Sequence, residues 1–186
     1  MLAYIFWHWP RAGTDVQAYE SRLIRFQETL ATVPVDGFQG SAIYRLAGVP
    51  WLPPNTAGYE ECYLLDSSCA MDLLNDAAVS EPCRAAHEQT VEHFGGGAAG
   101  LYRLRHGQPS LAEMNLRYWL AKPRGVRYPE FDARLLPILG SSPFALWRRN
   151  MVLGPTPEFC LQIPASVELP SDLVVCETKV ETVWRS

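Results

Sequence analysis

Hydrophobic and polar residues follow two different periods along the N-terminal part of the chain. Residues 2–9 are apolar and aromatic up to Pro10, which is typical of a short strand. From residue 16, apolar side chains recur at intervals of three and four, which predicts a helix over 16–33 with one apolar face. Thr14 and Gln17 have the spacing of a capping box and predict where this helix begins.

The following 70 residues predict the remaining elements of one compact unit. Apolar runs bounded by glycine and proline indicate strands at 38–47 and 59–65, joined by a long loop. Helical segments are expected at 68–79 and from an N-cap at Ser80 to 94, where Gly95–Gly97 ends the helix before a strand at 101–105. The order is β-α-β-β-α-β, which is the ferredoxin-like unit.

A second, shorter copy of this pattern follows. The strand predicted at 116–122 ends in Pro-Arg as the first strand does, and residues 131–136 match 19–24 in aromatic, acidic, small, Arg and aliphatic positions. The segment 165–173 is too short for a second helix. We therefore predict a complete repeat at 1–106, a linker at 107–113 and a truncated repeat at 114–186 that lacks its second helix.

The first strand also predicts how the two repeats meet. Both of its faces are apolar, Leu2, Tyr4 and Phe6 on one side and Ala3, Ile5, Trp7 and Trp9 on the other. Helices cover only one face, so the second repeat's sheet would cover the other. This arrangement is an α+β fold with two tandem repeats packed sheet to sheet as a barrel. The missing helix would leave the back of the second sheet bare, to be covered by a homodimer partner or by the chain's own loops.

Composition and charge exclude several classes of protein. With 48% hydrophobic and 19% charged residues the chain is expected to be globular, and a net charge of −4 without a basic run argues against nucleic acid. No apolar stretch is long enough to span a membrane. Five cysteines without metal-ligand spacing predict buried thiols in a reducing cytoplasm and no metal site.

Element order, the internal repeat and the stretch Glu81–Phe94 together resemble the dimeric α+β barrel superfamily in a tandem version. The His-containing stretch is similar to the second helix of the antibiotic-biosynthesis monooxygenase-like and stress-responsive branches. That superfamily includes cofactor-independent oxygenases, haem-degrading oxygenases, isomerases and proteins without assigned activity. The resemblance therefore implies a small-molecule pocket and leaves the reaction open.

Two histidines are the candidate acid/base residues. His87 lies on or beside the apolar stripe of the second predicted helix, where a neutral imidazole could act as a base or as an axial haem ligand. The alternative is a partly buried histidine bonded to backbone. His8 would act in a pocket if its strand face is the barrel interior, and would face solvent otherwise.

Aromatic and arginine side chains are the candidates for substrate binding. They are Trp7, Trp9, Trp51, Tyr63 and Arg103, with Trp51 and Asn55 as a lid and Arg103 as an anchor for an acidic ligand. Arginines in the predicted strands would form an anion site or would pair with Glu60, Glu61, Glu177 and Glu181. The alternative to an enzyme is a non-catalytic protein whose barrel is filled by side chains. A cavity of about 300 Å³ or more lined by a histidine would favour the enzyme.

Overall fold

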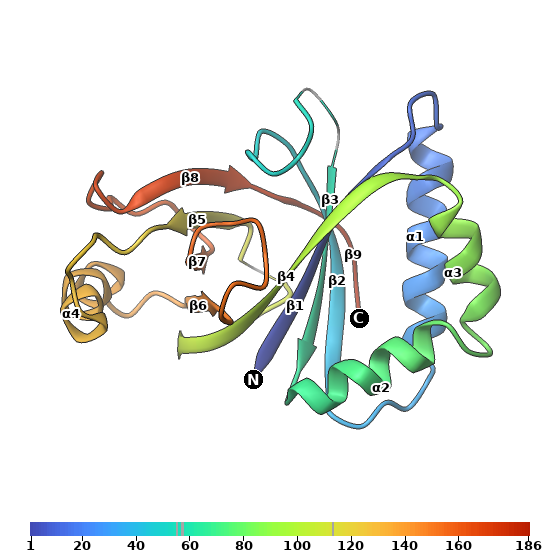
Figure 1. Cartoon of the computed structure of the whole chain (residues 1–186), viewed down its shortest axis with the longest axis horizontal. Coiled ribbons are helices and arrows are strands. Elements are labelled where there is room, and N and C mark those ends of the chain that lie inside the picture. Colours follow the sequence, from blue (N-terminus) through green and yellow to red (C-terminus); the bar gives the residue numbers. More distant parts are fainter. Residues whose placement is uncertain (55, 57, 113) are drawn as a thin grey trace.

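The computed structural model describes residues 1–54, 56, 58–112 and 114–186 (Figure 1). Its elements, in chain order, are β1 (Leu2–Pro10), α1 (Val16–Ala31), β2 (Phe38–Leu46), β3 (Gly58–Leu65), α2 (Ser68–Ala78), α3 (Arg84–Val91), β4 (Phe94–Gly107), β5 (Leu116–Leu120), α4 (Tyr128–Leu139), β6 (Ala145–Arg149), β7 (Phe159–Ile163), β8 (Val174–Lys179) and β9 (Glu181–Arg185). The fold is a mixed α+β fold, as the sequence predicts. No helix in the described part of the chain has the length and apolar character needed to cross a membrane.

The nine strands form one antiparallel sheet in the order β8-β5-β7-β6-β4-β1-β3-β2-β9. The strands at its two ends, β8 and β9, are consecutive in the chain and are separated only by Val180. The C-terminal segment therefore pairs first with β5 and then with β2, and the curled sheet closes on itself. The long strand β4 makes the equivalent link on the other side, because it pairs with β1 and then with β6.

Helices cover the outer faces of the curled sheet, as Figure 1 shows. α1, α2 and α3 lie over β1, β2, β3 and β4, and α4 lies over β5, β6 and β7. Residues 164–173 contain no helix, and Val167, Leu169 and Leu173 of this segment pack against the apolar cluster that includes Phe131 and Phe159. Of the two covers expected for this sheet, the chain's own loop is the one observed.

The barrel interior is filled by side chains from both halves of the sheet. Ala3, Ile5 and Trp7 of β1 lie in one buried cluster with Trp119 of β5 and Trp147 of β6, each of them 0% exposed. One face of β1 therefore packs against β5 and β6, which belong to the same nine-stranded sheet. Side chains of the described residues thus pack closely on this side of the sheet, as in the core of a small barrel.

A buried ion pair crosses the interior. Glu60 of β3 accepts from Trp7 Nε1 at 2.9 Å and lies 3.4 Å from Arg117 Nε of β5, and both charged side chains are 1% exposed. The guanidinium also lies 4.9 Å from the ring centre of Tyr44 and donates to the Met114 carbonyl. Arg117 thus points into the barrel and pairs with Glu60. Of the two alternatives for the strand arginines, an anion site or pairing with glutamates, Arg117 follows the second.

Other strand arginines also pair with acids. Arg45 contacts Glu20 and Glu181 at 2.6 Å, and the remaining pairs join Arg105 to Asp132 and Arg148 to Glu158. The expected partner Glu61 pairs with His8 instead.

Three local predictions are wrong. Asp15, not Thr14, caps α1, because its carboxylate accepts from the Ala18 amide at 2.7 Å. The helix expected from Ser80 begins only at Arg84, without a side-chain cap. Of the five cysteines expected to be buried, Cys69 is exposed and Cys176 is half-buried.

The glycine run at 95–97 lies inside β4, although it was expected to precede the strand. A Cβ at Gly96 would come within 2.4 Å of the Trp9 ring, and one at Gly97 within 2.6 Å of the Phe6 ring. Glycine is therefore required where aromatic rings of β1 lie across the neighbouring strand.

Candidate functional site

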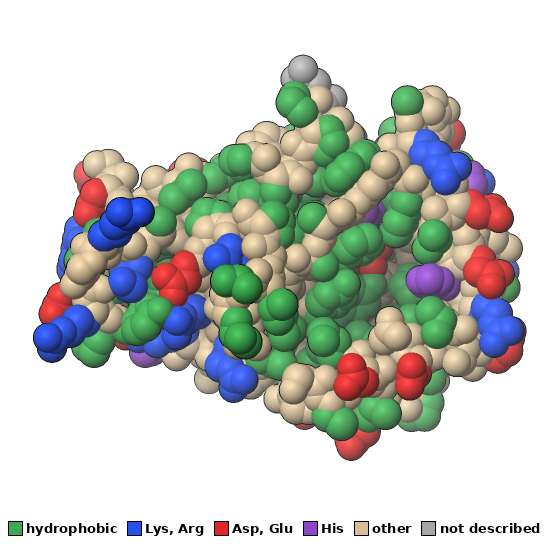
Figure 2. All heavy atoms as spheres, in the orientation of Figure 1, with side chains coloured by type: hydrophobic (Ala, Val, Ile, Leu, Met, Phe, Trp, Pro, Cys, Tyr) green, Lys and Arg blue, Asp and Glu red, His purple; other side chains and the backbone are tan. Residues whose placement is uncertain are grey.

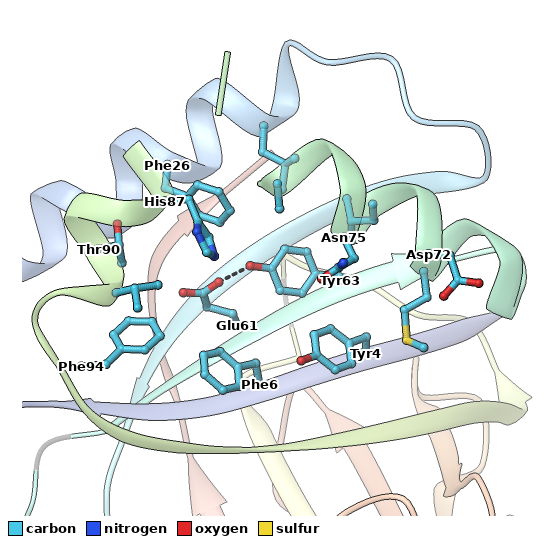
Figure 3. A pocket seen from close by; sticks show the side chains of 15 residues that line it. Tyr4, Phe6, Phe26, Glu61, Tyr63, Asp72, Asn75, His87, Thr90 and Phe94 are labelled. Atoms are coloured by element: carbon cyan, nitrogen blue, oxygen red, sulfur yellow. Dashed lines mark hydrogen bonds between the residues drawn. The ribbon is translucent and has the colours of Figure 1, made fainter. Parts of the chain in front are cut away.

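A pocket lies outside the barrel, between the sheet and the helices α1, α2 and α3. It has a volume of about 510 Å³. Figure 2 shows it as a hollow lined mainly by hydrophobic side chains, with acidic and histidine atoms visible inside. Its lining is drawn in Figure 3 and comprises Tyr4, Phe6, Phe26, Leu30, Glu61, Tyr63, Met71, Asp72, Leu74, Asn75, Ala78, His87, Thr90, Val91 and Phe94.

Strand periodicity places the pocket floor. Alternate residues of a strand share a face, so Tyr4 and Phe6 of β1 point to the same side as Glu61 and Tyr63 of β3. Tyr4 lies opposite Tyr63, and Phe6 lies opposite Glu61. An acidic side chain is therefore set among aromatic rings on an otherwise apolar floor.

Glu61 is only 3% exposed and accepts hydrogen bonds on both carboxylate oxygens. His8 Nε2 lies 3.1 Å from Oε1, Gln27 Nε2 donates to Oε2 at 2.8 Å, and the Tyr63 hydroxyl also donates to Oε2 (Figure 3). Three donors around one carboxylate hold both of its oxygens in place. Glu61 is consequently a fixed, desolvated negative charge at the pocket floor.

The network continues behind the floor. His8 Nδ1 lies 2.6 Å from the Tyr19 hydroxyl of α1, and Ser41 donates to Gln27 Oε1 at 2.7 Å. If His8 is neutral, its Nε2–H donates to Glu61 and the Tyr19 hydroxyl donates to Nδ1, so each of these contacts is satisfied. His8 is fully buried and stacks on Phe94 with ring centres 4.8 Å apart. It holds Glu61 in place and does not line the pocket.

His87 approaches from the opposite wall. It lies on α3, is half-buried and packs against Phe26 with ring centres 5.5 Å apart. Its imidazole forms no hydrogen bond with any residue that the structure describes, and Figure 3 shows it pointing toward Glu61 and Tyr63. An unbonded imidazole above a fixed carboxylate is free to exchange a proton with a bound molecule.

The phenols of the site are held neutral. Burial, and then the Glu61 charge, raise the pKa of Tyr63 well above its ordinary value of 10.0. The same two causes raise the pKa of Tyr4, and the pKa of Tyr19 is raised by burial, Glu61 and Tyr59. These hydroxyls therefore serve as hydrogen-bond donors and not as phenolate bases.

The structure brings together some of the residues singled out from the sequence and separates others. Tyr63 and His87 line the pocket, and His8 lies directly behind it. Trp7 belongs to the barrel core, and the half-buried Trp9 and Trp51 pack against that core, with the Trp7 and Trp51 ring centres 5.6 Å apart. Arg103 is exposed on β4 and does not line this pocket. Asn55 lies outside the described residues.

Sequence reasoning missed Glu61, Tyr4, Phe6 and Asn75 as pocket residues. A signal for Glu61 was available, because Glu60 and Glu61 are adjacent in a strand that is otherwise apolar or aromatic. Adjacent strand residues point to opposite faces, so one carboxylate had to enter the barrel and the other the helical side. Asn75 had no comparable signal.

The pocket lining does not fit haem. His87 is an available axial ligand, but the lining contains no Arg or Lys to pair with the propionates and contains Glu61 and Asp72. No group of three or more His, Cys, Asp or Glu side chains in the described ranges is arranged to hold a metal ion.

Comparison with known proteins identifies the fold. No protein-family model and no curated protein matches the sequence. Among solved structures, a "putative monooxygenase" from Lactobacillus acidophilus NCFM aligns with a TM-score of 0.62 and 10% identity, covering 100% of this chain and 95% of the other. An anthrone oxidase-like protein aligns with a TM-score of 0.53 and 12% identity over 97% and 89%. A chlorite dismutase-like structure aligns with a TM-score of 0.47 and 9% identity over 98% and 95%. The chain shares the α+β barrel fold of the first two proteins.

Proposed function

We propose that this chain is a tandem α+β barrel that binds a small aromatic molecule between α1, α2, α3 and the sheet. The two units would be residues 1–106 and 114–186. The strand order β4-β1-β3-β2 of one half and β8-β5-β7-β6 of the other supports this division. The single observation behind the proposed activity is His87 facing the Glu61–Tyr63 pair across an aromatic pocket.

The lining defines the class of ligand. Tyr4, Phe6 and Phe94 offer aromatic surfaces, while the Asp, Glu, Lys and Arg side chains in the described lining are two carboxylates, Glu61 and Asp72. A ligand that is already an anion would meet Glu61 and Asp72 without a compensating cation. The ligand is therefore a neutral, flat aromatic molecule with a weakly acidic O–H or C–H group. This replaces the acidic ligand expected from Arg103.

The proposed chemistry begins with proton transfer to His87. The imidazolium that forms is stabilised by the fixed charge of Glu61, because opposite charges attract strongly in a water-poor site. The Asn75 amide is a candidate donor to the oxygen on which the substrate anion places its charge. His8 acts through Glu61 and is a positioning residue.

The fate of the anion decides the reaction. An electron-rich anion can pass its electrons to O₂ directly, so an anthrone would take up one O₂ and become an anthraquinone with release of water. If the proton returns to another carbon, the reaction is an isomerisation. The names of the first two aligned structures, a "putative monooxygenase" and an anthrone oxidase-like protein, favour the oxygenase.

A hydroxylated anthrone tests the proposal. We expect saturable quenching of the intrinsic fluorescence and O₂ uptake measured with an electrode. His87→Ala should lower kcat/KM by about 100-fold, the usual contribution of a general base. His93→Ala is the matched control, because His93 is half-buried, lies outside the pocket lining and bonds through its side chain to the Gln89 carbonyl. The activity of this variant should stay within about twofold of the wild-type value.

The outcomes separate the alternatives. The absence of both fluorescence quenching and O₂ uptake would overturn the proposal. Quenching without uptake would support a non-catalytic binding protein, the alternative favoured by the filled barrel. A Soret band on adding haemin that is lost in His87→Ala would instead support haem binding, against the lining described above.

A further inference from the structure

A second concave surface lies where β4 pairs with β6. This groove has a volume of about 430 Å³ and is lined by four arginines, Arg103, Arg105, Arg148 and Arg149, together with Leu104, Asn150 and Met151. It shares no lining residue with the helix–sheet pocket. We propose that this groove binds the dianion of a phosphate monoester.

Two of the arginines are placed against the ordinary preference of a sheet. Arg103 of β4 and Arg148 of β6 are direct partners in the antiparallel register. Like charges directly opposite each other destabilise a strand pair. An anion bound between them would compensate for this repulsion.

The carboxylates of the described residues neutralise only part of this charge. Arg105 pairs with Asp132, with Nε 2.9 Å from Oδ1, and Arg148 pairs with Glu158, with Nε 2.9 Å from Oε1. Arg149 donates only to the carbonyls of Gly154, at 3.1 Å, and Thr156. Arg103 has no side-chain partner among the residues that the structure describes, so two guanidinium charges lack a counter-charge.

Three of the four guanidiniums are held in place before any ligand binds. Arg105 and Arg148 lie 5.3 and 4.1 Å from the ring centre of Tyr128, and the two carbonyls hold Arg149. Arg149 Nε is also buried and has no hydrogen-bond partner in the described structure. A preorganised donor set loses less side-chain entropy when it binds an anion.

The net charge and geometry favour a phosphate monoester. Two uncompensated positive charges match a dianion, and the guanidinium fork pairs with phosphate oxygens in two-point fashion. Met151 at the rim is 80% exposed and offers an apolar contact to the organic part of the ester. Figure 2 shows Lys and Arg side chains over this part of the molecule.

Isothermal titration calorimetry with phenyl phosphate and with inorganic phosphate tests the site. We expect saturable binding to the full chain, with phenyl phosphate the tighter ligand, and about tenfold weaker binding for Arg103→Gln. Arg124→Gln is the matched control, because this substitution removes the same charge outside the groove. Arg124 is exposed on a loop between β5 and α4. Its affinity should stay within about twofold of the wild-type value.

Two results would overturn the proposal. One is the absence of saturable heat with either probe in the wild-type chain. The other is equal weakening by Arg103→Gln and Arg124→Gln, which would show a general effect of net charge. The thermal midpoint of Arg103→Gln should not fall, since the variant relieves the repulsion from Arg148. If the thermal midpoint of Arg103→Gln falls so far that the variant is partly unfolded during the titration, the lost binding would reflect a structural role of Arg103.

A lipid headgroup and a free metabolite present the same chemistry, and sedimentation with vesicles distinguishes them. The groove would be assigned to a lipid headgroup if the chain sediments with phosphatidic acid vesicles but not with phosphatidylcholine vesicles, and if Arg103→Gln abolishes this sedimentation. Binding of phenyl phosphate without retention on vesicles would assign it to a soluble phosphate monoester.

Discussion

At the residue scale, two adjacent glutamates have opposite environments because they lie on opposite faces of β3. Glu60 enters the barrel and pairs with Arg117, whereas Glu61 faces the helices and accepts from His8, Gln27 and Tyr63. A sequence shows that both carboxylates are in a strand. Only the structure shows which donors surround each one, because all of these donors except Tyr63 come from β1, β5 and α1.

The buried phenols near Glu61 predict how stability depends on pH. Tyr4, Tyr19 and Tyr63 all have a raised pKa in the folded chain. Below pH 10 these groups are protonated in both states and contribute nothing to the pH dependence. Above about pH 10, the ordinary tyrosine pKa, the unfolded chain releases protons that the folded chain retains, so stability falls as pH rises.

Urea unfolding between pH 8 and pH 11 would measure this fall. We expect the midpoint to be level to about pH 9.5 and to decrease above it, with a shallower decrease in Tyr63→Phe. Tyr63 should account for a clear part of the slope because it is buried and bonded to Glu61. An unchanged slope in Tyr63→Phe would contradict the raised pKa of this phenol.

At the element scale, the helices and most strands follow from periodicity and turn residues. The predicted helix over 16–33 is observed as α1, and the strands at 38–47 and 59–65 are observed as β2 and β3. β4 is much longer than expected, because glycines that break a helix are tolerated in a strand where rings from the next strand fill their space. A single-strand pattern does not contain this cross-strand information.

Gly96 provides the test of this explanation. Gly96→Ala should destabilise the chain by about 1–3 kcal/mol, because the new Cβ would overlap the Trp9 ring. The double variant with Trp9→Leu should lose less stability than the two single variants together, since the smaller side chain frees the space. Denaturant unfolding of the four proteins of the cycle measures the coupling, and strict additivity would argue against the ring contact as the cause.

At the scale of the whole molecule, the two halves are joined by strand pairing and by the Glu60–Arg117 pair. β4 and the C-terminal segment each pair with strands of both halves, so neither half has a complete barrel alone. The homodimer was expected as one cover for a bare sheet. The loop at 164–173 supplies that cover, and subunit number by native mass spectrometry remains the direct test.

Breaking the ion pair from one side should be costly. Arg117→Met leaves Glu60 charged and buried, and we expect a loss of about 3–5 kcal/mol. Adding Glu60→Gln to this variant should recover part of the loss, because the remaining polar group is neutral and can still accept from Trp7. Chemical unfolding followed by tryptophan fluorescence would measure both effects. A double variant less stable than Arg117→Met would contradict this account.

The amino-acid sequence by itself determined the element order, the amphipathic first helix and the two apolar faces of β1, because these depend on periods of two and 3.6 residues within one segment. It also placed two carboxylates in β3. Tertiary structure decided that the barrel is filled, that the pocket lies under the helices and that His87 faces Glu61. Those features arise from the packing of segments far apart in the chain, since His8 lies 53 residues and Gln27 lies 34 residues from Glu61. No local pattern encodes which face a distant side chain meets.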